Sequence, residues 1–156
     1  MKKTLIFIAV ILVVSTVGMY FIFKNNPPLE VITIDRNPIG PNSTIIGVVN
    51  KGFRPVEIEE VFVNNNSSPR NSEVLISNAV DRFRPEDKNV DGESKEFIRI
   101  EPGMSSSEYI TKFDQDQLTK DDIIYGISVI HNVELENVTI KYKYLLISYD
   151  TTIHYE

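Results

Sequence analysis

The sequence predicts an all-β domain, an antiparallel sandwich of about eight strands, preceded by one N-terminal transmembrane helix. Three observations support this fold class. An uncharged apolar segment of 20 residues follows the first three residues. Beyond it, short segments of alternating apolar and polar residues recur at fairly regular spacing, with turn residues between them. No amphipathic helical pattern of about 12 residues interrupts them. The length of 156 residues fits one domain plus an appendage.

The apolar segment, residues 4–23, reads TLIFIAVILVVSTVGMYFIF. As a helix rising about 1.5 Å per residue it spans roughly 30 Å, the thickness of the hydrocarbon core of a bilayer. The alternative is a cleaved signal peptide, whose apolar region of about 7–15 residues ends at a site of the A-x-A type. The only alanine in this run is Ala9, far from its end. We therefore predict an uncleaved signal anchor, with secretion after signal cleavage as the alternative.

The charges around the anchor predict its orientation. Lys2, Lys3 and the amino terminus precede the apolar run, and positive charge tends to stay on the cytoplasmic side of a membrane. The domain that follows is therefore expected outside the cell membrane. The predicted division of the chain is a cytoplasmic N-terminus (1–3), a transmembrane signal anchor (4–23), a stalk (24–28) and an extracytoplasmic β-sandwich domain (29–156).

The overall charge excludes some classes of partner. The whole chain has a net charge of −6, and the two N-terminal lysines leave −8 for the remainder. Such an acidic balance argues against binding of nucleic acid or of an anionic lipid surface. The chain has no cysteine, so the domain must be held together by its core alone.

Eight segments have the pattern of strands: 31–36, 43–50, 54–64, 73–80, 96–100, 107–113, 123–131 and 138–149. The second segment ends at Asn50-Lys51-Gly52, a strong turn signal. The third alternates, doubles its polar residue at Glu59-Glu60 and then resumes, which is the pattern of a β-bulge. Residues 114–122 are the only candidate for a helical turn.

The last two strand segments indicate which residues face the core. One face of the segment 123–131 carries Tyr125, Ile127, Val129 and His131. One face of the segment 138–149 carries Val138, Ile140, Tyr142, Tyr144 and Leu146. We expect Tyr142 and Tyr144 in the core rather than on an aromatic binding surface, because tyrosine is a favoured strand residue. The link NVELEN between the two segments suggests a hairpin.

Two stretches carry a resemblance to known proteins. TIIGVVNKGFRPVEIEEVFVNN (44–65) is similar to the strand, turn and strand that open immunoglobulin-like modules, and IEPGMSSSEY (100–109) resembles their proline-glycine corner. With the anchor before it, the chain resembles small membrane-anchored surface proteins of Gram-positive bacteria that have an immunoglobulin-like or fibronectin-like β-sandwich ectodomain. The resemblance implies a fold and a location, but no activity.

One loop has the beginning of a calcium site. DKNVDG places Asp87, Asn89 and Asp91 at the first, third and fifth positions of an EF-hand loop, with a glycine at the sixth. The twelfth position, which should be a bidentate acid, is Ile98, so the EF-hand pattern fails. A looser site remains as an alternative to a solvated turn. Its candidate ligands are Asp87, Asn89, Asp91, Glu93 and Glu96.

Other constellations give weaker signals. His131 ends a strand segment and His154 follows the last segment, so the two could be neighbours on paired strands, but a zinc site would also need a carboxylate. The sequence contains neither a cysteine nor a G-x-S-x-G motif for nucleophilic catalysis. Adjacent acids such as Glu59-Glu60 point to opposite faces of a strand and cannot act as an acid/base pair. We predict no catalytic residue and no cofactor-binding residue.

The leading hypothesis is a non-enzymatic, membrane-tethered extracytoplasmic module that binds a protein or another component of the cell envelope. One alternative is a calcium-responsive surface domain that uses the acidic loop 81–96. Another is an enzyme whose site is dispersed over the sandwich, which no sequence feature supports. An exposed apolar patch on one sheet would favour the binding module. A pocket of polar groups with perturbed pKa values would favour the enzyme.

Overall fold

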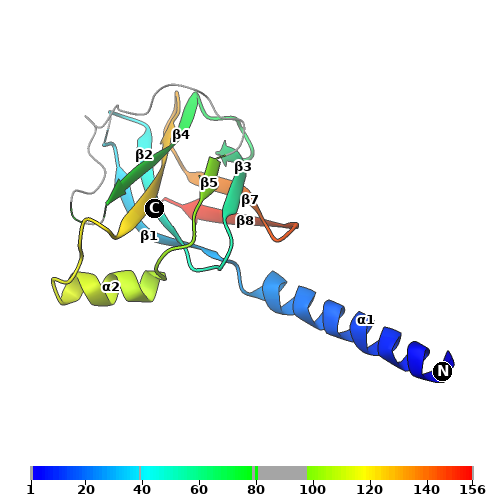
Figure 1. Ribbon diagram of the computed structural model, residues 1–156. Helices are drawn as coiled ribbons and strands as arrows, with labels where there is room; N and C mark the ends of the chain where they lie inside the picture. The colour runs from blue at the N-terminus through cyan, green and yellow to red at the C-terminus, as the bar shows by residue number, and fades with distance from the viewer. Residues whose placement is uncertain (1, 39, 79, 81–97, 156) are drawn as a thin grey trace.

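The computed structural model describes residues 2–38, 40–78, 80 and 98–155 (Figure 1). These residues form two helices and eight strands. In chain order they are α1 (Lys2–Asn25), β1 (Leu29–Arg36), β2 (Ser43–Asn50), β3 (Val56–Val63), β4 (Asn71–Asn78), β5 (Ile98–Ile100), α2 (Ser106–Asp114), β6 (Ile123–Ile130), β7 (Asn137–Tyr144) and β8 (Ile147–His154).

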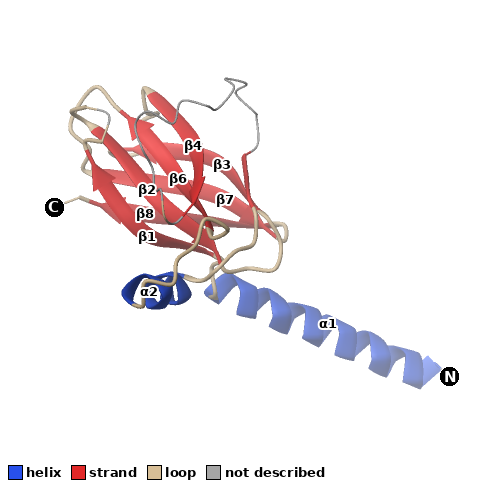
Figure 2. Ribbon diagram, turned by 60° about the vertical axis from the view of Figure 1, so that its left-hand side comes forward, coloured by secondary structure: helices blue, strands red, loops and turns tan. Residues whose placement is uncertain are grey.

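The strands build two four-stranded sheets in which every neighbouring pair is antiparallel. One sheet has the order β1-β2-β6-β4 and the other has the order β5-β3-β7-β8. Figure 2 shows the two sheets as stacked layers, with α1 extending away from them. The prediction of an all-β antiparallel sandwich preceded by one apolar helix is therefore confirmed.

The core lies between the sheets because alternate residues of the central strands point inward. Ile46 and Ile127 from one sheet, and Val138 and Tyr142 from the other, are completely buried. Tyr144 is buried in the same cluster, so both tyrosines belong to the core as predicted. Burial of each apolar side chain of this size stabilises the fold by about 1.5–3 kcal/mol.

A second, smaller cluster covers the outer face of the β1-β2-β6-β4 sheet. Val49 of β2 and Ile124 of β6 pack there against Met104 and Tyr109. Strand β2 is consequently buried along its whole length. This explains why its sequence is a continuous apolar run rather than an alternation.

The strand predicted over 107–113 is wrong, because these residues belong to helix α2. The Ser105 side chain accepts a hydrogen bond from the Glu108 backbone N–H (3.2 Å) and caps the helix. Tyr109 is buried, and Glu108 pairs with Lys112 one turn later. The helical turn predicted over 114–122 lies almost wholly beyond the end of this helix. This helix has only nine residues, so the spacing of its apolar residues also fits a strand. The residues that distinguish a helix from a strand here are Ser105 at the N-cap and Glu108 three positions later.

The hairpin predicted at NVELEN is also wrong. Strands β6 and β7 belong to different sheets, so residues 131–136 cross between the layers. The hairpin comes one strand later, where Leu145 and Leu146 join β7 to β8. Leu146, which was expected on the buried face, is 97% exposed. Both leucines have positive φ (50° and 66°), a conformation that leucine rarely adopts. Because the turn contains no residue typical of turns, the segment 138–149 has the pattern of one unbroken strand.

The predicted bulge in β3 is confirmed. The pairing passes from Ile58 opposite Tyr142 to Glu60 opposite Lys141, which leaves Glu59 as the extra residue. Glu59 forms an ion pair with Lys143 on the neighbouring strand. The bulge keeps the apolar residues on both sides of it directed to the core.

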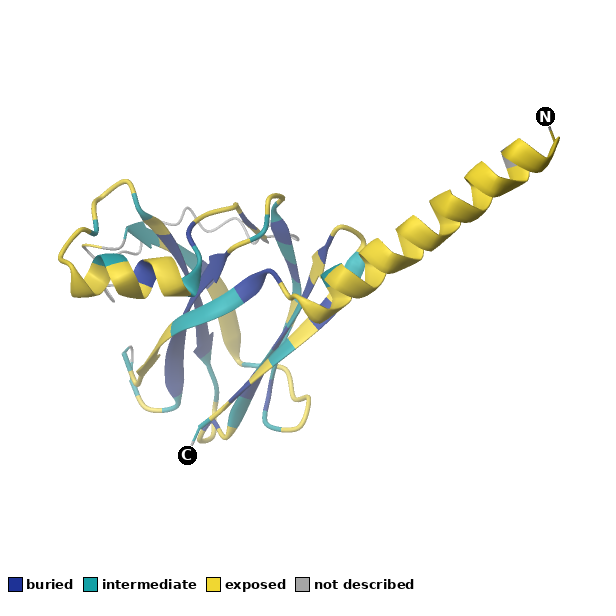
Figure 3. Ribbon diagram, turned by 90° about the horizontal axis from the view of Figure 1, so that it is seen from below, coloured by how far each residue is buried: buried dark blue, intermediate teal, exposed yellow. Residues whose placement is uncertain are grey.

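Helix α1 extends away from the sandwich (Figure 3), and its described side chains before Phe23 are exposed. It is long and apolar enough to cross a membrane. Its last turn is built into the domain. Phe23 packs against the core, its carbonyl accepts a hydrogen bond from the Tyr149 hydroxyl (2.8 Å), and Lys24 Nζ donates to the Ser148 carbonyl (3.0 Å). Pro28 is already buried.

Candidate functional site

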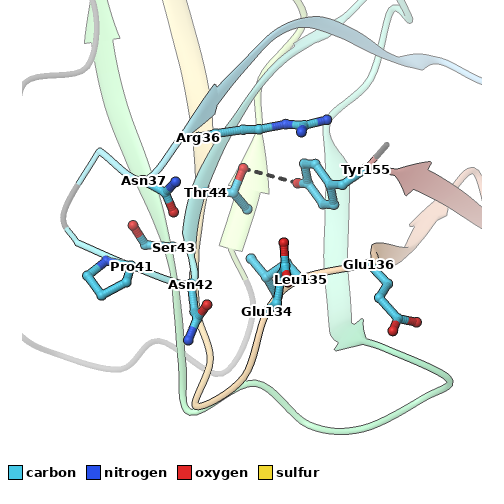
Figure 4. A pocket seen from close by; sticks show the side chains of 10 residues that line it. All are labelled: Arg36, Asn37, Pro41, Asn42, Ser43, Thr44, Glu134, Leu135, Glu136 and Tyr155. Carbon is cyan, nitrogen blue, oxygen red and sulfur yellow. Dashed lines mark hydrogen bonds between the residues drawn. The ribbon is translucent and has the colours of Figure 1, made fainter.

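The first candidate site lies at the end of the sandwich opposite α1. Strands β1 and β8 both begin beside the last turn of α1, so their C-terminal ends lie at the far end of the sheets. A cavity of about 280 Å³ opens there (Figure 4), and we call it the far-end pocket. It is lined by Arg36, Asn37, Pro41, Asn42, Ser43, Thr44, Glu134, Leu135, Glu136 and Tyr155.

Tyr155 organises one wall of the far-end pocket. Its hydroxyl donates a hydrogen bond to Thr44 Oγ1 (3.0 Å), and the Arg36 guanidinium lies 5.1 Å from the centre of its ring. Burial raises the pKa of Tyr155, although the hydrogen bond to Thr44 and the charge of Arg36 act in the opposite direction. The hydroxyl is therefore protonated at neutral pH and is suited to hydrogen bonding rather than to base catalysis.

Asparagine side chains fix the other wall. Asn64 Nδ2 donates to the Glu134 carbonyl (2.6 Å), and Asn64 Oδ1 accepts from the Glu136 backbone N–H (2.8 Å). Asn64, Asn37 and Asn42 all have positive φ, which asparagine tolerates better than most residues. These contacts hold the crossing segment 131–136, which supplies part of the pocket wall, against the turn after β3.

The second candidate site is an open groove of about 440 Å³ between β1 and α2, which we call the α2–β1 groove. It is lined by Ile32, Thr33, Ile34, Asp35, Tyr109, Ile110, Phe113 and Ile124. Ile110 and Phe113 are 53% and 48% exposed, so about half of each apolar side chain faces water. Among the described residues β1 pairs only with β2, which makes it an edge strand beside this groove.

Glu30 holds α2 in place beside the groove. Its Oε2 accepts hydrogen bonds from the Ser106 backbone N–H (2.9 Å) and hydroxyl (2.6 Å), and its Oε1 contacts Lys51 Nζ (2.7 Å). Burial alone would raise the pKa of Glu30, but the hydrogen bonds from Lys51 and Ser106 outweigh it and lower the pKa from 4.5 to about 2. A carboxylate at a helix N-terminus is also favoured by the helix dipole.

The candidate calcium ligands Asp87, Asn89, Asp91, Glu93 and Glu96 lie outside the described residues. Within the described part of the chain, no group of three His, Asp or Glu side chains could hold a metal ion.

The two histidines are not on paired strands, because β8 pairs with β7 and His131 follows β6 in the other sheet. The His131 backbone N–H donates to the Asn42 carbonyl (3.0 Å), which places His131 next to the far-end pocket.

Neither hollow was found by sequence reasoning. The far-end pocket joins Arg36 and Thr44 to Tyr155, which lies more than a hundred residues further along the chain and shares no motif with them. One wall of the α2–β1 groove is formed by α2, most of which is predicted as a strand (107–113) from the sequence. The overlooked signal for it was the cap at Ser105 with Glu108 at the third helical position.

The fold and the two hollows define a two-layer β-sandwich protein with an N-terminal helix apolar enough to span a membrane. Comparisons with protein-family models, with curated proteins and with solved structures found no match.

Proposed function

We propose that the protein is a single-pass, membrane-tethered binding module whose sandwich lies outside the cytoplasmic membrane and binds another protein of the cell envelope. The length and apolar surface of α1 support the tether. Lys2 and Lys3 at its start support an N-terminus inside and a C-terminal domain outside.

The strand order supports an immunoglobulin-like classification. The order β1-β2-β6-β4 corresponds to the A-B-E-D sheet of a constant-type immunoglobulin domain, and β3-β7-β8 corresponds to its C-F-G sheet. Strand β5 is an additional strand beside β3. Many cell-surface domains share this architecture.

The observation that carries the binding function is the α2–β1 groove. An edge strand offers unpaired backbone N–H and C=O groups to an extended peptide, and an apolar groove beside it accepts alternate side chains of that peptide. The half-exposed Ile110 and Phe113, together with Ile34 on β1, provide such a surface. We therefore infer that the partner contributes an extended segment with apolar side chains.

The far-end pocket favours binding over catalysis. Its lining residues include one guanidinium, two carboxylates and several amide and hydroxyl groups. The Tyr155 hydroxyl, whose pKa is raised by burial, is occupied by its hydrogen bond to Thr44. These groups can bind a polar ligand. The hydroxyls of Ser43 and Tyr155 donate to the Gly40 carbonyl and to Thr44 Oγ1, whereas a catalytic nucleophile donates to a base.

Site-specific photo-crosslinking tests the proposal. The full-length chain, with p-benzoylphenylalanine in place of Phe113, is expected to form one discrete protein adduct in the cells that make it. The same photoreactive residue in place of Ile76, which is more exposed (64% against 48%) but lies on β4 at the opposite edge of the sheet, should not. Ile110→Glu should abolish the adduct at position 113, whereas Ile76→Glu should leave it intact.

Two results would contradict the groove as the binding site. Adducts of equal yield at positions 76 and 113 would indicate random collisions. A discrete adduct at Val133, which is exposed beside the far-end pocket, with none at position 113, would place the partner at the other end of the sandwich.

A further inference from the structure

We propose that the sandwich rests on the lipid bilayer through an apolar rim formed by Phe53, Leu145 and Leu146, which dips into the membrane interface beside α1. The proposal rests on the proposed function in one respect, since α1 must lie in the membrane. It adds a second contact with lipid, made by the β-domain itself, which holds this end of the domain at the membrane surface.

The rim adjoins the last turn of α1. The Phe53 ring centre lies 6.2 Å from that of Phe23 in α1 and 6.0 Å from that of Tyr144, which ends β7. Phe23 and Tyr144 are themselves 6.5 Å apart. The hairpin formed by β7 and β8 projects from the sandwich on the side where α1 leaves it (Figure 1).

The junction sets the height of the rim relative to the bilayer. The apolar run of α1 ends at Phe23, and Lys24 is the first charged residue after it. Lys24 Nζ contacts the Ser148 carbonyl at 3.0 Å and lies 5.3 Å from the centre of the Tyr149 ring. The boundary between hydrocarbon and water on α1 therefore falls beside the start of β8, two residues from the hairpin tip. Tyr20, close to the end of the apolar run, is of a residue type that is enriched at this boundary.

The hairpin tip itself is unfavourable in water. Leu146 is 97% exposed, and Leu145 beside it is also exposed. Both residues have positive φ, as in the two-residue turns that usually contain Asn-Gly. Leucine at these positions does not favour the backbone conformation of the turn, and its apolar side chain gains nothing from exposure to water. Contact with lipid accounts for both leucines at once.

The contact is apolar rather than electrostatic. The domain beyond the anchor carries a net charge of −8, which opposes adsorption to anionic lipid. Exposed apolar side chains that face the bilayer bind it without a basic patch. Lipid is favoured over a protein partner as the occupant, because the rim is continuous with the helix that spans the membrane.

Single-cysteine labelling of the full-length protein in lipid nanodiscs tests the inference, since the chain has no cysteine of its own. An environment-sensitive fluorophore is attached in three variants: Val13→Cys in the middle of α1, Leu146→Cys in the rim, and Val133→Cys at the far end. We expect doxyl-labelled lipids to quench the first two probes, and aqueous iodide to quench only the third efficiently.

The three probes separate failure of the anchor from failure of the rim. A probe at position 13 that iodide reaches would overturn the membrane span and the rim together. If position 13 is in lipid but position 146 behaves like position 133, the rim proposal fails and the span stands. A probe at position 146 that is shielded from iodide without quenching by labelled lipids would mean a protein contact, such as a second copy, and would also overturn the proposal.

A turn variant tests the role of the leucines. Leu145→Asn/Leu146→Gly supplies the residues that a turn with positive φ prefers, so the melting temperature in detergent should rise by a few degrees. In nanodiscs the same change should strongly reduce lipid quenching of a probe at Phe53→Cys. Unchanged quenching at position 53 would show that the leucines do not hold the domain on the membrane.

Discussion

Asn50 illustrates how one buried polar residue connects a turn to a neighbouring strand. It is 1% exposed, and its Nδ2 donates to the carbonyls of Arg54 (2.8 Å) and Ile100 (2.9 Å). Its Oδ1 accepts from the Gly52 backbone N–H (2.9 Å). The turn signal in the sequence was correct, but the hydrogen bond to β5 depends on a residue 50 positions away.

Asn50→Ala should destabilise the domain by about 2 kcal/mol, because two carbonyl groups lose their hydrogen-bond donor inside the protein. Urea denaturation of the full-length chain in detergent measures the change. Asn132→Ala, at an exposed position, is the matched control and should cost no more than about 0.5 kcal/mol. Equal costs for the two variants would contradict the role given to Asn50.

Glu30 should make stability depend on pH. Its pKa in the folded protein is about 2, below its ordinary value of 4.5, so its contribution is present above pH 4.5 and is lost as the pH falls from 4.5 toward 2. The full shift corresponds to at most about 3 kcal/mol, and screening at this partly exposed site reduces it to about 1–2 kcal/mol. Glu30→Gln should therefore cost about 1–2 kcal/mol at pH 7 and much less at pH 2.5. A difference that does not depend on pH would contradict this assignment.

At the scale of single elements, β6 shows how far alternation alone identifies the buried face. Ile127 is fully buried, whereas Ile123 at the start of the same strand is exposed. Ile127→Asp should cost at least about 4 kcal/mol, because an unpaired carboxylate would enter the core. Ile123→Asp should cost only about 0.5 kcal/mol. Thermal or urea unfolding distinguishes the two, and similar costs would mean that the assigned faces are wrong.

Sequence reasoning succeeded where a strand carries its own alternation, and it failed where tertiary contacts decided the conformation. Strands β3 and β7 and the bulge at Glu59 follow from local periodicity. Helix α2 is too short for its period to be distinguished from that of a strand, and the Glu30 contacts that hold it come from 76 residues earlier in the chain. The leucine hairpin was missed because its residues contradict the usual turn chemistry.

At the scale of the whole molecule, we expect α1 to remain attached to the domain. N-terminal sequencing of the protein from native membranes should give a chain whose start precedes the apolar run 4–23. The last turn of α1 packs against Tyr144 and Tyr149, so removal of the helix would also uncover part of the core. A mature chain that begins between Gly18 and Leu29 would contradict the anchor and favour secretion after cleavage.

The junction between α1 and β1 also has a mechanical consequence. Only three residues separate the two elements, and two of them, Pro27 and Pro28, have a fixed φ. With Phe23 and Lys24 already bound to the sandwich, the chain has no free hinge at this point.

A helix longer than the local hydrocarbon thickness tilts, so in a thin bilayer the whole domain should tilt together with α1 as one rigid body. This change in tilt can be measured as the distance from a probe at Val133 to the lipid surface, in nanodiscs of different acyl-chain length. Bilayer thickness would thus set the direction in which the α2–β1 groove faces.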